Sequence, residues 1–473
     1  MTAFAAQIDD GVDTAVALGQ LPPSEAVPAD AEVEPIVVPT APAAASDPNV
    51  VEITFYTPVG LEEVLRPLAR QFQESHPDIR IRFMAEEIVL GVEQDSLLNR
   101  AAGSDCTIGR TFDLDFEDGN LGAVLLPLGP LLDLDTTMQA ESFYPALLQE
   151  LTVDGELIGL PLGVPIPYLE YNRRLFEEAG VPEPTVGWTL DDFLEAALQL
   201  SSGEGETRQY AYALPFRTFL VQNAAIHFDV QLIDYNEPVP NFDYPAATEM
   251  LTWYTDLIRT HEVQPFMAED IVTSRSQFDV LLQEERIAMW AFASVNFYYK
   301  YLSEEVPLPR IDLGIAPHPV GPNGVSQPPS FVQAYFIFAD SPHAAACWEW
   351  IRFLATEPSA AYRPEQAFQM LPGHIETAES QAYADIVGAE IAAIGLAYIN
   401  SLPSNPQPPM PDWMWPGSGW LVQAYYDVVT GESDVTAALA TAEARFSQYR
   451  QCVIEQDAFE DEAAQESCEA SVE

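Results

Sequence analysis

Carboxylates and phenols are the side chains of this sequence that could do chemistry, and two arrangements of them are considered, although no acid pair stands out among so many acids. Asp113 and Asp115 lie two residues apart, and hydrolysis of a glycosidic bond requires a pair of carboxylic acids. Adjacent tyrosines occur as Tyr298-Tyr299 and Tyr425-Tyr426, and their phenolates could bind ferric iron. With 73 acidic residues, however, solvated loop acids are the simpler interpretation of the first pair. No His or Glu is placed to complete an iron site, so amphipathic packing is favoured for the tyrosines.

Motifs of common enzymes are missing from the sequence. It contains no G-x-S-x-G, no Walker loop, no G-x-G-x-x-G after a predicted strand and no H-E-x-x-H. Its six histidines are spread singly along the chain. We therefore expect no catalytic residue, no cofactor and no metal site. A secreted carbohydrate-active enzyme that uses an acid pair is the alternative.

The charge of the chain excludes several classes of partner. Asp and Glu number 73 against 19 Lys and Arg, a formal net charge of -54, and Lys300 is the one lysine. Nucleic-acid binding needs clustered basic residues to displace counterions, and anionic membranes attract basic segments. We expect neither kind of partner.

Four cysteines are present, and a structural zinc site is not expected, because none forms C-x-x-C and no His lies near them at the spacing of zinc ligands. Cys452 and Cys468 close a short loop and could pair in an oxidising compartment, or remain two free thiols. Whether Cys106 pairs with Cys347 stays open.

The elements that position these residues alternate between strand and helix. Residues 1–48, which are rich in Pro and Ala, are predicted to be a disordered tether that begins like the end of a truncated secretory signal. Apolar alternation over 51–55, helical spacing over 61–72 and alternation over 79–83 predict a βαβ unit. No apolar run reaches the length of a membrane span, about 18 to 20 residues.

Further signals extend this α/β pattern to residue 450. Thr189 and Asp192 form the capping box of a predicted helix, while 287–292 and 331–338 are typical of buried strands. Residues 451–473 are expected to be an acidic tail.

Several ordered segments resemble the family 1 extracellular solute-binding proteins, the sugar-binding receptors of ABC importers, which include the maltodextrin-binding proteins. The segments are DGELIGLP (154–161), LEYNRRLFEEAGVPEP (169–184), GWTLDDF (187–193), FDVLLQEERIAM (278–289), 317–341 and 413–449. In the segment 169–184, Asn172 is expected to be a helix N-cap. The resemblance covers roughly residues 50–450.

The resemblance implies a type II periplasmic-binding-protein fold, which is two α/β lobes joined by a hinge with a ligand cleft between them. The first lobe would comprise 49–163 and 328–395, and the second 164–327 and 396–450. Ligands of open α/β sheets bind beyond the carboxyl ends of the strands. Sugars need an aromatic ring against their apolar face and polar groups for their hydroxyls.

Residues in loops after the predicted strands, or in Trp-rich segments, are therefore the candidate ligand contacts. They are Tyr56, Phe112, Asp113, Tyr168, Phe219, Phe292, Asn296, Gln333, Trp413, Trp415 and Trp420. Trp188 and Trp290 are instead predicted to lie in the core. One departure from the maltodextrin binders is Pro165, which stands where those proteins place an acid soon after the hinge-crossing proline. The identity of the sugar is therefore not carried over.

The resemblance implies a receptor and not an enzyme: a monomer that captures a neutral carbohydrate by lobe closure and delivers it to an ABC permease. It would be extracytoplasmic and held at the membrane by its tether. A receptor for ferric iron or another solute, and a sensory binding module of the same fold, are the alternatives within this fold.

Overall fold

The computed structural model describes residues 50–472 apart from several internal ranges, and the predicted tether 1–48 lies outside the described residues. The ranges and residues left out between 50 and 472 are 58–60, 86–96, 112–113, 115–120, 214–226, 229, 231–244, 268–270, 292–310, 323, 325–331, 363–368, 403–411, 415 and 460.

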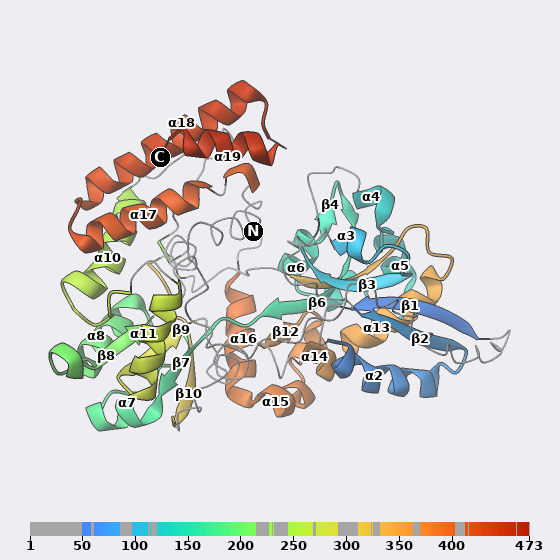
Figure 1. Cartoon of the computed structure of the whole chain (residues 1–473). Coiled ribbons are helices and arrows are strands. Elements are labelled where there is room, and N and C mark those ends of the chain that lie inside the picture. The colour runs from blue at the N-terminus through green and yellow to red at the C-terminus, as the bar shows by residue number, and fades with distance from the viewer. Residues whose placement is uncertain are drawn as a thin grey trace, which may run out of the picture.

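The first lobe is built on a six-stranded sheet with the order β12-β6-β11-β3-β1-β2 (Figure 1). Its strands are β1 (Val51–Thr57), β2 (Ile79–Ala85), β3 (Cys106–Arg110), β6 (Leu160–Pro165), β11 (Gln333–Ile337) and β12 (Met370–Pro372). β1 pairs with β2 in parallel, and α2 (Leu61–Ser75) connects them, so the predicted βαβ unit is confirmed. A small hairpin, β4 (Thr152–Val153) and β5 (Glu156–Leu157), precedes β6.

The second lobe contains a four-stranded sheet with the order β10-β7-β9-β8. Its strands are β7 (Tyr168–Asn172), β8 (Tyr210–Ala213), β9 (Ile287–Ala291) and β10 (Leu313–Pro317). Two residues, Ile166 and Pro167, separate β6 of the first sheet from β7 of the second, and Figure 1 shows this extended stretch running from one lobe into the other. It is one strand of the predicted hinge.

Helices cover both sheets. Those that pack with the first lobe are α2, α3 (Leu97–Arg100), α4 (Leu121–Val124), α5 (Gly129–Leu134), α6 (Pro145–Glu150), α13 (Ala344–Thr356), α14 (Ile375–Ala378), α15 (Gln381–Val387) and α16 (Ala389–Ser401). Those of the second lobe are α7 (Arg173–Ala179), α8 (Leu190–Leu200), α10 (Pro245–Arg259), α11 (Ile271–Gln283), α17 (Pro416–Thr430), α18 (Val435–Gln456) and α19 (Glu462–Ala470). Short 3-10 turns lie at Ala140–Ser142, Gly205–Thr207, Pro358–Ala361 and Asp412–Met414.

Local signals explain several of these helix starts. The Thr189 hydroxyl accepts the N–H of Asp192, and the Asp192 carboxylate accepts the N–H of Thr189, so the capping box is confirmed at α8. The Asn172 side chain accepts the N–H of Arg174 at the start of α7, as the sequence predicts. Gly180 then ends α7 in the left-handed conformation, at φ 68°, which glycine adopts without steric cost.

The C-terminal segment 451–473, expected to be an acidic tail, is folded through most of its length. α18 continues to Gln456, and α19 returns along it (Figure 1). Val453, Ala458 and Cys468 are buried in the second-lobe core, and a Cys452–Cys468 disulfide joins the two helices. A second disulfide, Cys106–Cys347, joins β3 to α13 inside the first-lobe core.

α16 lies at the base of the molecule between the lobes (Figure 1). The predicted lobe boundary at 395 falls inside this helix, which runs unbroken to Ser401, and Tyr398 and Ile399 still pack in a first-lobe cluster. Among the described residues no single helix has the length and apolarity of a membrane span; α15 and α16 reach it only as a pair, bent by 116°.

Candidate functional site

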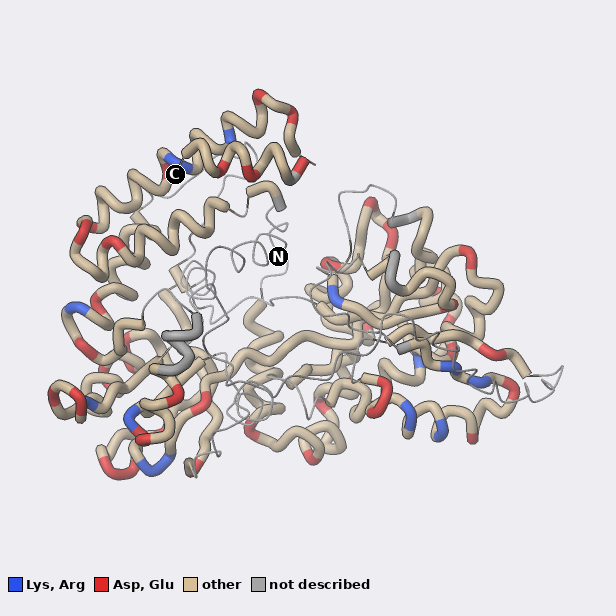
Figure 2. Tube along the Cα trace, in the orientation of Figure 1, with Lys and Arg blue, Asp and Glu red and all other residues tan. Residues whose placement is uncertain are grey.

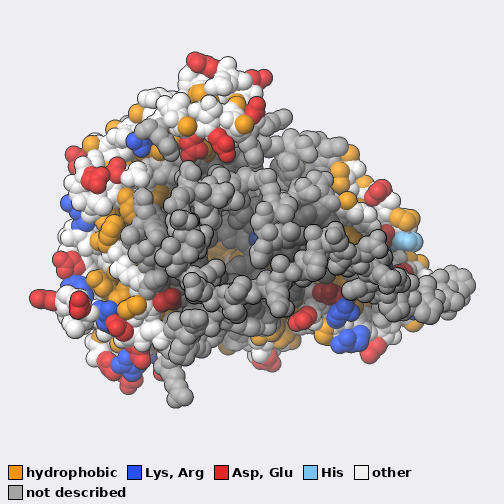
Figure 3. Space-filling view, in the orientation of Figure 1, with side chains coloured by type: hydrophobic (Ala, Val, Ile, Leu, Met, Phe, Trp, Pro, Cys, Tyr) orange, Lys and Arg blue, Asp and Glu red, His pale blue; other side chains and the backbone are white. Residues whose placement is uncertain are grey.

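Several strands of the first sheet end at one edge, on the side of the hinge. β1, β3 and β6 run parallel to one another, so Thr57, Arg110 and Pro165 share one edge, and β11 enters there at Gln333, which lies opposite Arg110. β6 leaves this edge for the second lobe. We call it the first-lobe edge. In the space-filling view, acidic side chains lie on the outer parts of both lobes (Figure 3).

Glu150, the last residue of α6, forms hydrogen bonds with two segments that meet at this edge. Its Oε1 accepts the Thr111 hydroxyl at 2.6 Å and the backbone N–H of Val332 at 3.2 Å. The backbone N–H of Thr111 in turn donates to the Val332 carbonyl at 2.9 Å. Burial raises the pKa of Glu150, although both hydrogen bonds act in the opposite direction. Thr111 directly precedes the predicted contacts Phe112 and Asp113, so Glu150 fixes the position of the residue before them.

The second sheet presents a matching edge of different composition. Parallel β8 and β9 end where antiparallel β7 begins at Tyr168, and β10 ends at Pro317, which lies opposite Tyr168. We call this the second-lobe edge. Burial, followed by the nearby charge of Glu170, raises the pKa of the Tyr168 phenol, which therefore stays protonated as a hydrogen-bond donor.

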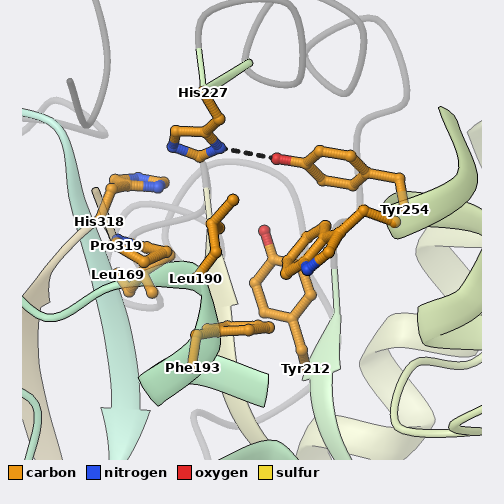
Figure 4. A pocket seen from close by; sticks show the side chains of 9 residues that line it. Leu169, Leu190, Phe193, Tyr212, His227, Tyr254, His318 and Pro319 are labelled. Atoms are coloured by element: carbon orange, nitrogen blue, oxygen red, sulfur yellow. Dashed lines mark hydrogen bonds between the residues drawn. The ribbon is translucent and has the colours of Figure 1, made fainter. Parts of the chain in front are cut away.

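A small pocket opens beside this edge (Figure 4). Its lining residues are Leu169, Leu190, Phe193, Tyr212, His227, Trp253, Tyr254, His318 and Pro319. Aromatic rings dominate it: Phe193 contacts Tyr212 edge-on with centroids 5.2 Å apart, and Trp253 contacts Tyr254 at 4.8 Å. Its volume of about 20 Å³ suits a water molecule and not a sugar ring.

Two histidines are among the polar residues of this pocket. Nδ1 of His227 lies 2.8 Å from the Tyr254 hydroxyl, the contact dashed in Figure 4. Burial, followed by the proximity of His227, lowers the pKa of His318 to about 3, while a hydrogen bond with the Tyr168 backbone opposes this shift. His318 is therefore neutral at physiological pH, and it holds the start of β7 in place.

Several predicted contacts lie at these edges or in the adjacent core. Gln333 starts β11 at the first-lobe edge, Tyr56 is buried near the end of β1, and Tyr168 begins β7 at the second-lobe edge. Trp413 packs its ring on Phe459. The predicted contacts that lie outside the described residues are Phe112, Asp113, Phe219, Phe292, Asn296 and Trp415.

Trp420 is placed away from the edges. It is 6% exposed, and its ring packs against Phe446 and Tyr449 from α18 in the second-lobe core. The Gly and Ser residues around it, which suggested a loop, instead form the first turn of α17. We do not carry Trp420 into the proposed site.

The aromatic residues predicted to be core are buried. Trp290 is 0% exposed and donates to the buried Glu170 carboxylate at 3.0 Å, while Trp188 donates to the Pro317 carbonyl at 2.8 Å. Tyr425 and Tyr426 pack in the second-lobe core, and Tyr298-Tyr299 lie outside the described residues. Within the described ranges no three His, Cys, Asp or Glu side chains gather as a metal site.

Glu150, His227 and His318 were not among the residues predicted from the sequence. Nothing in the sequence separates Glu150 from the other acids, because its role depends on α6 ending at the edge where β3 and β11 meet. The two histidines are 91 positions apart, and only the return of the chain after β10 brings them together.

Comparisons with known proteins agree with this architecture. Residues 59–361 match the family model described as bacterial extracellular solute-binding protein. A binding protein of Brucella abortus (strain 2308) is 24% identical over 336 residues, which cover 68% of this chain and 75% of that protein.

Solved structures share the fold at low sequence identity. The sugar-binding protein MalE from Xanthomonas citri is 20% identical and covers 86% of this chain and 100% of its own, with a TM-score of 0.65. An ABC substrate-binding protein from Listeria monocytogenes, in complex with cycloalternan, is 18% identical and covers 85% and 99%, with a TM-score of 0.60. The predicted type II periplasmic-binding-protein fold is confirmed, and the family match extends over more than half of the 473 residues. This chain belongs to the bacterial extracellular solute-binding proteins.

Proposed function

We propose that this protein is the receptor of an ABC importer and that it captures a neutral sugar or oligosaccharide between its lobes. The observation that carries the proposal is the pairing of two edges across one hinge. The first-lobe edge offers Glu150 and Gln333 to hydroxyl groups, and the second-lobe edge offers Tyr168 beside a ring-lined wall. Sugars require this combination of ring contact and polar contact.

Rotation about the hinge brings the edges onto the ligand. The chain passes between the lobes at Ile166-Pro167 and again between β10 and β11. A ligand shifts the balance toward the closed form only by binding that form more tightly. Micromolar binding, about -8 kcal/mol, is enough to drive a shift of a few kcal/mol.

Charge favours a neutral ligand over a phosphorylated one. The net charge is -54, and Figure 2 shows acidic residues on both lobes. Arg173 and Arg174, at the end of β7 remote from the second-lobe edge, are engaged by the acids Glu183 and Glu285. Neither of these two arginines contributes to an anion site at the second-lobe edge, while Arg110 ends β3 at the first-lobe edge.

Membership of an extracellular solute-binding family supports a location outside the cytoplasm, and the two disulfides fit an oxidising compartment. We further propose that residues 1–48 tether it to the membrane, that it works as a monomer, and that its closed form docks on a permease. Solved structures of the same fold in complex with cycloalternan and with bound D-mannitol support a carbohydrate or polyol ligand.

The test is a thermal-shift screen of the full chain against neutral mono- to tetrasaccharides, polyols, phosphosugars and Fe(III), followed by calorimetry. We expect a neutral carbohydrate to raise the unfolding temperature and to reduce the radius of gyration in X-ray scattering, because ligand binds only the native, closed form. Chromatography of the incubated sugar should recover it unchanged. A cleaved product would support the enzyme, and a shift with Fe(III) alone would support the ferric receptor; either result contradicts the proposal.

A further inference from the structure

We propose that Glu150 is the acidic acceptor for a ligand hydroxyl at the first-lobe edge, in place of the acid that Pro165 leaves out. The inference rests on the proposed function and names one residue that determines specificity. It comes from the surroundings of the two carboxylate oxygens of Glu150, which differ.

One oxygen of Glu150 has a structural role. Oε1 accepts both the Thr111 hydroxyl and the Val332 N–H, which join the end of β3 to the start of β11. These bonds fix the direction of the carboxylate. Preorganised acceptors bind a hydroxyl without a further entropic cost of ordering the side chain.

The other oxygen has no such role. Among the described residues no hydrogen bond reaches Oε2 of Glu150, and no Lys, Arg or His forms an ion pair with it. A half-buried carboxylate without a cationic partner is costly, and burial raises its pKa. Such a group gains most from a hydroxyl donor that arrives with a ligand.

An adjacent phenol is also without a partner. Tyr398 of α16 is 3% exposed, and its hydroxyl makes no hydrogen bond among the described residues. The charge of Glu150, after burial, is a cause of the raised pKa of Tyr398, so the two groups lie near each other. A buried polar group without a partner commonly marks a place for a water molecule or a ligand.

The position of Glu150 matches the gap in the sequence pattern. α6 packs against β6, whose last residue is Pro165. Proline has no side-chain acceptor, whereas Glu150 reaches the same sheet edge from the neighbouring helix. The acid needed for a sugar hydroxyl is thus supplied by a different element.

Glu150→Gln separates the two roles. The amide oxygen of glutamine keeps the bonds from Thr111 and Val332, but an amide N–H₂ replaces the oxygen that would accept the ligand. The full chain, wild type and E150Q, is titrated by calorimetry with the neutral carbohydrate found in the screen. Glu141→Gln, an exposed acid of the same lobe remote from this edge, is the matched control.

We expect E150Q to weaken binding at least tenfold, because the acceptor oxygen is replaced by an amide N–H₂ and a donor then faces the donor of the ligand. E141Q should bind like the wild type, and E150Q without ligand should unfold at the wild-type temperature or above it. Equal affinities of E150Q and wild type would overturn the inference while leaving the receptor function intact.

A weaker E150Q that is also less stable without ligand would likewise overturn it, because the loss would then be structural. If the wild type itself binds no carbohydrate, the proposed function fails first, and the inference falls with it.

Discussion

The two lobes meet the hinge with edges of different chemistry. The first-lobe edge carries a carboxylate, a hydroxyl and an amide, from Glu150, Thr111 and Gln333. The second-lobe edge borders on a pocket whose walls are mostly aromatic and whose polar atoms belong to His227, His318 and Tyr254. The first-lobe edge is thus mainly polar, whereas the second-lobe edge lies beside a mainly aromatic wall.

Burial shifts the pKa values of the titratable groups at the two edges in opposite directions. It favours the neutral form of both Glu150 and His318, so the pKa of the acid rises and that of the base falls. Ionisation of Glu150 therefore carries a cost of burial in the first lobe, whereas His318 in the second lobe is neutral at physiological pH. A ligand can relieve that cost only at the first-lobe edge.

The largest expected effect concerns the disulfide beneath the first-lobe edge. Cys106 and Cys347 are separated by 241 positions, and Cys106 begins β3, which ends at the first-lobe edge beside Glu150. C106A/C347A should lower the free energy of unfolding by about 5 kcal/mol, because a long loop is released in the unfolded chain. Urea denaturation under non-reducing conditions measures this loss.

The second-lobe disulfide is the matched control. Cys452 and Cys468 are only 16 positions apart, so C452A/C468A should cost about 3 kcal/mol. Hydrogen exchange should report loosening of β3 and α13 in the first variant and of α18 and α19 in the second. Loosening of both lobes to the same extent would contradict the separation of their cores.

The second effect is a pH dependence from His318. Its pKa of about 3 in the folded protein lies below the ordinary value of 6.5. Between pH 6.5 and pH 3 the unfolded chain therefore binds a proton at His318 that the folded protein does not bind. The stability from this group is complete above pH 6.5 and is lost as the pH falls toward 3. Between pH 7 and pH 4 the loss should be about 3 kcal/mol, and H318Q should flatten the slope in urea denaturation.

Glu150 should behave with the opposite sign. Its pKa is raised in the folded protein, so its contribution to stability is present below the ordinary pKa of the acid and is lost as the pH rises through the folded value. E150Q should thus gain stability over the wild type at neutral pH but not at pH 4. The same slope for H318Q and wild type, or no gain in E150Q, would show that the two edges do not differ in this way.

The sequence could predict the scaffold better than the site. Apolar periodicity and capping residues act locally, so the βαβ unit, the start of α8 and the strand β9 follow from patterns a few residues long. Trp420 shows the limit: its Gly and Ser neighbours suggest a loop, but packing on α18 makes them helical. Tertiary contact outweighs a weak local preference there.

Glu150 could not be selected for a similar reason. Its role comes from three segments distant in sequence, α6, the end of β3 and the start of β11, which only the sheet order places together. The charge of the C-terminal segment predicts a solvated tail, although Val453, Ala458 and Cys468 give the segment a buried face. Composition predicts solvation of a segment, and its apolar spacing decides whether it packs.

A third, smaller effect tests the charge that the second lobe does bury. Glu170 of β7 accepts the Trp290 N–H of β9, and both residues are at least 96% buried, being 4% and 0% exposed. E170A should destabilise the protein by about 2 kcal/mol, because the indole N–H loses this acceptor. E170Q keeps the acceptor and should lose less; equal losses in urea denaturation would show that packing, not this bond, sets the cost.

The smallest effect concerns an ion pair between the second lobe and the base of the hinge. Arg173 at the start of α7 pairs with Glu390 of α16 at 3.2 Å and with Glu183 at 2.8 Å. Glu390 is half exposed, so its loss should change stability by less than about 1 kcal/mol. Because α16 packs with the first lobe, this contact links the lobes, and E390Q should change ligand affinity by up to about fivefold while E183Q, confined to one lobe, changes it less. Calorimetry at low and at high salt distinguishes a role of the charge from a role in packing. The change in affinity caused by E390Q should shrink at high salt, because salt screens the ion pair. A change in affinity that salt leaves the same would mean that Glu390 acts through packing of α16 and not through its charge.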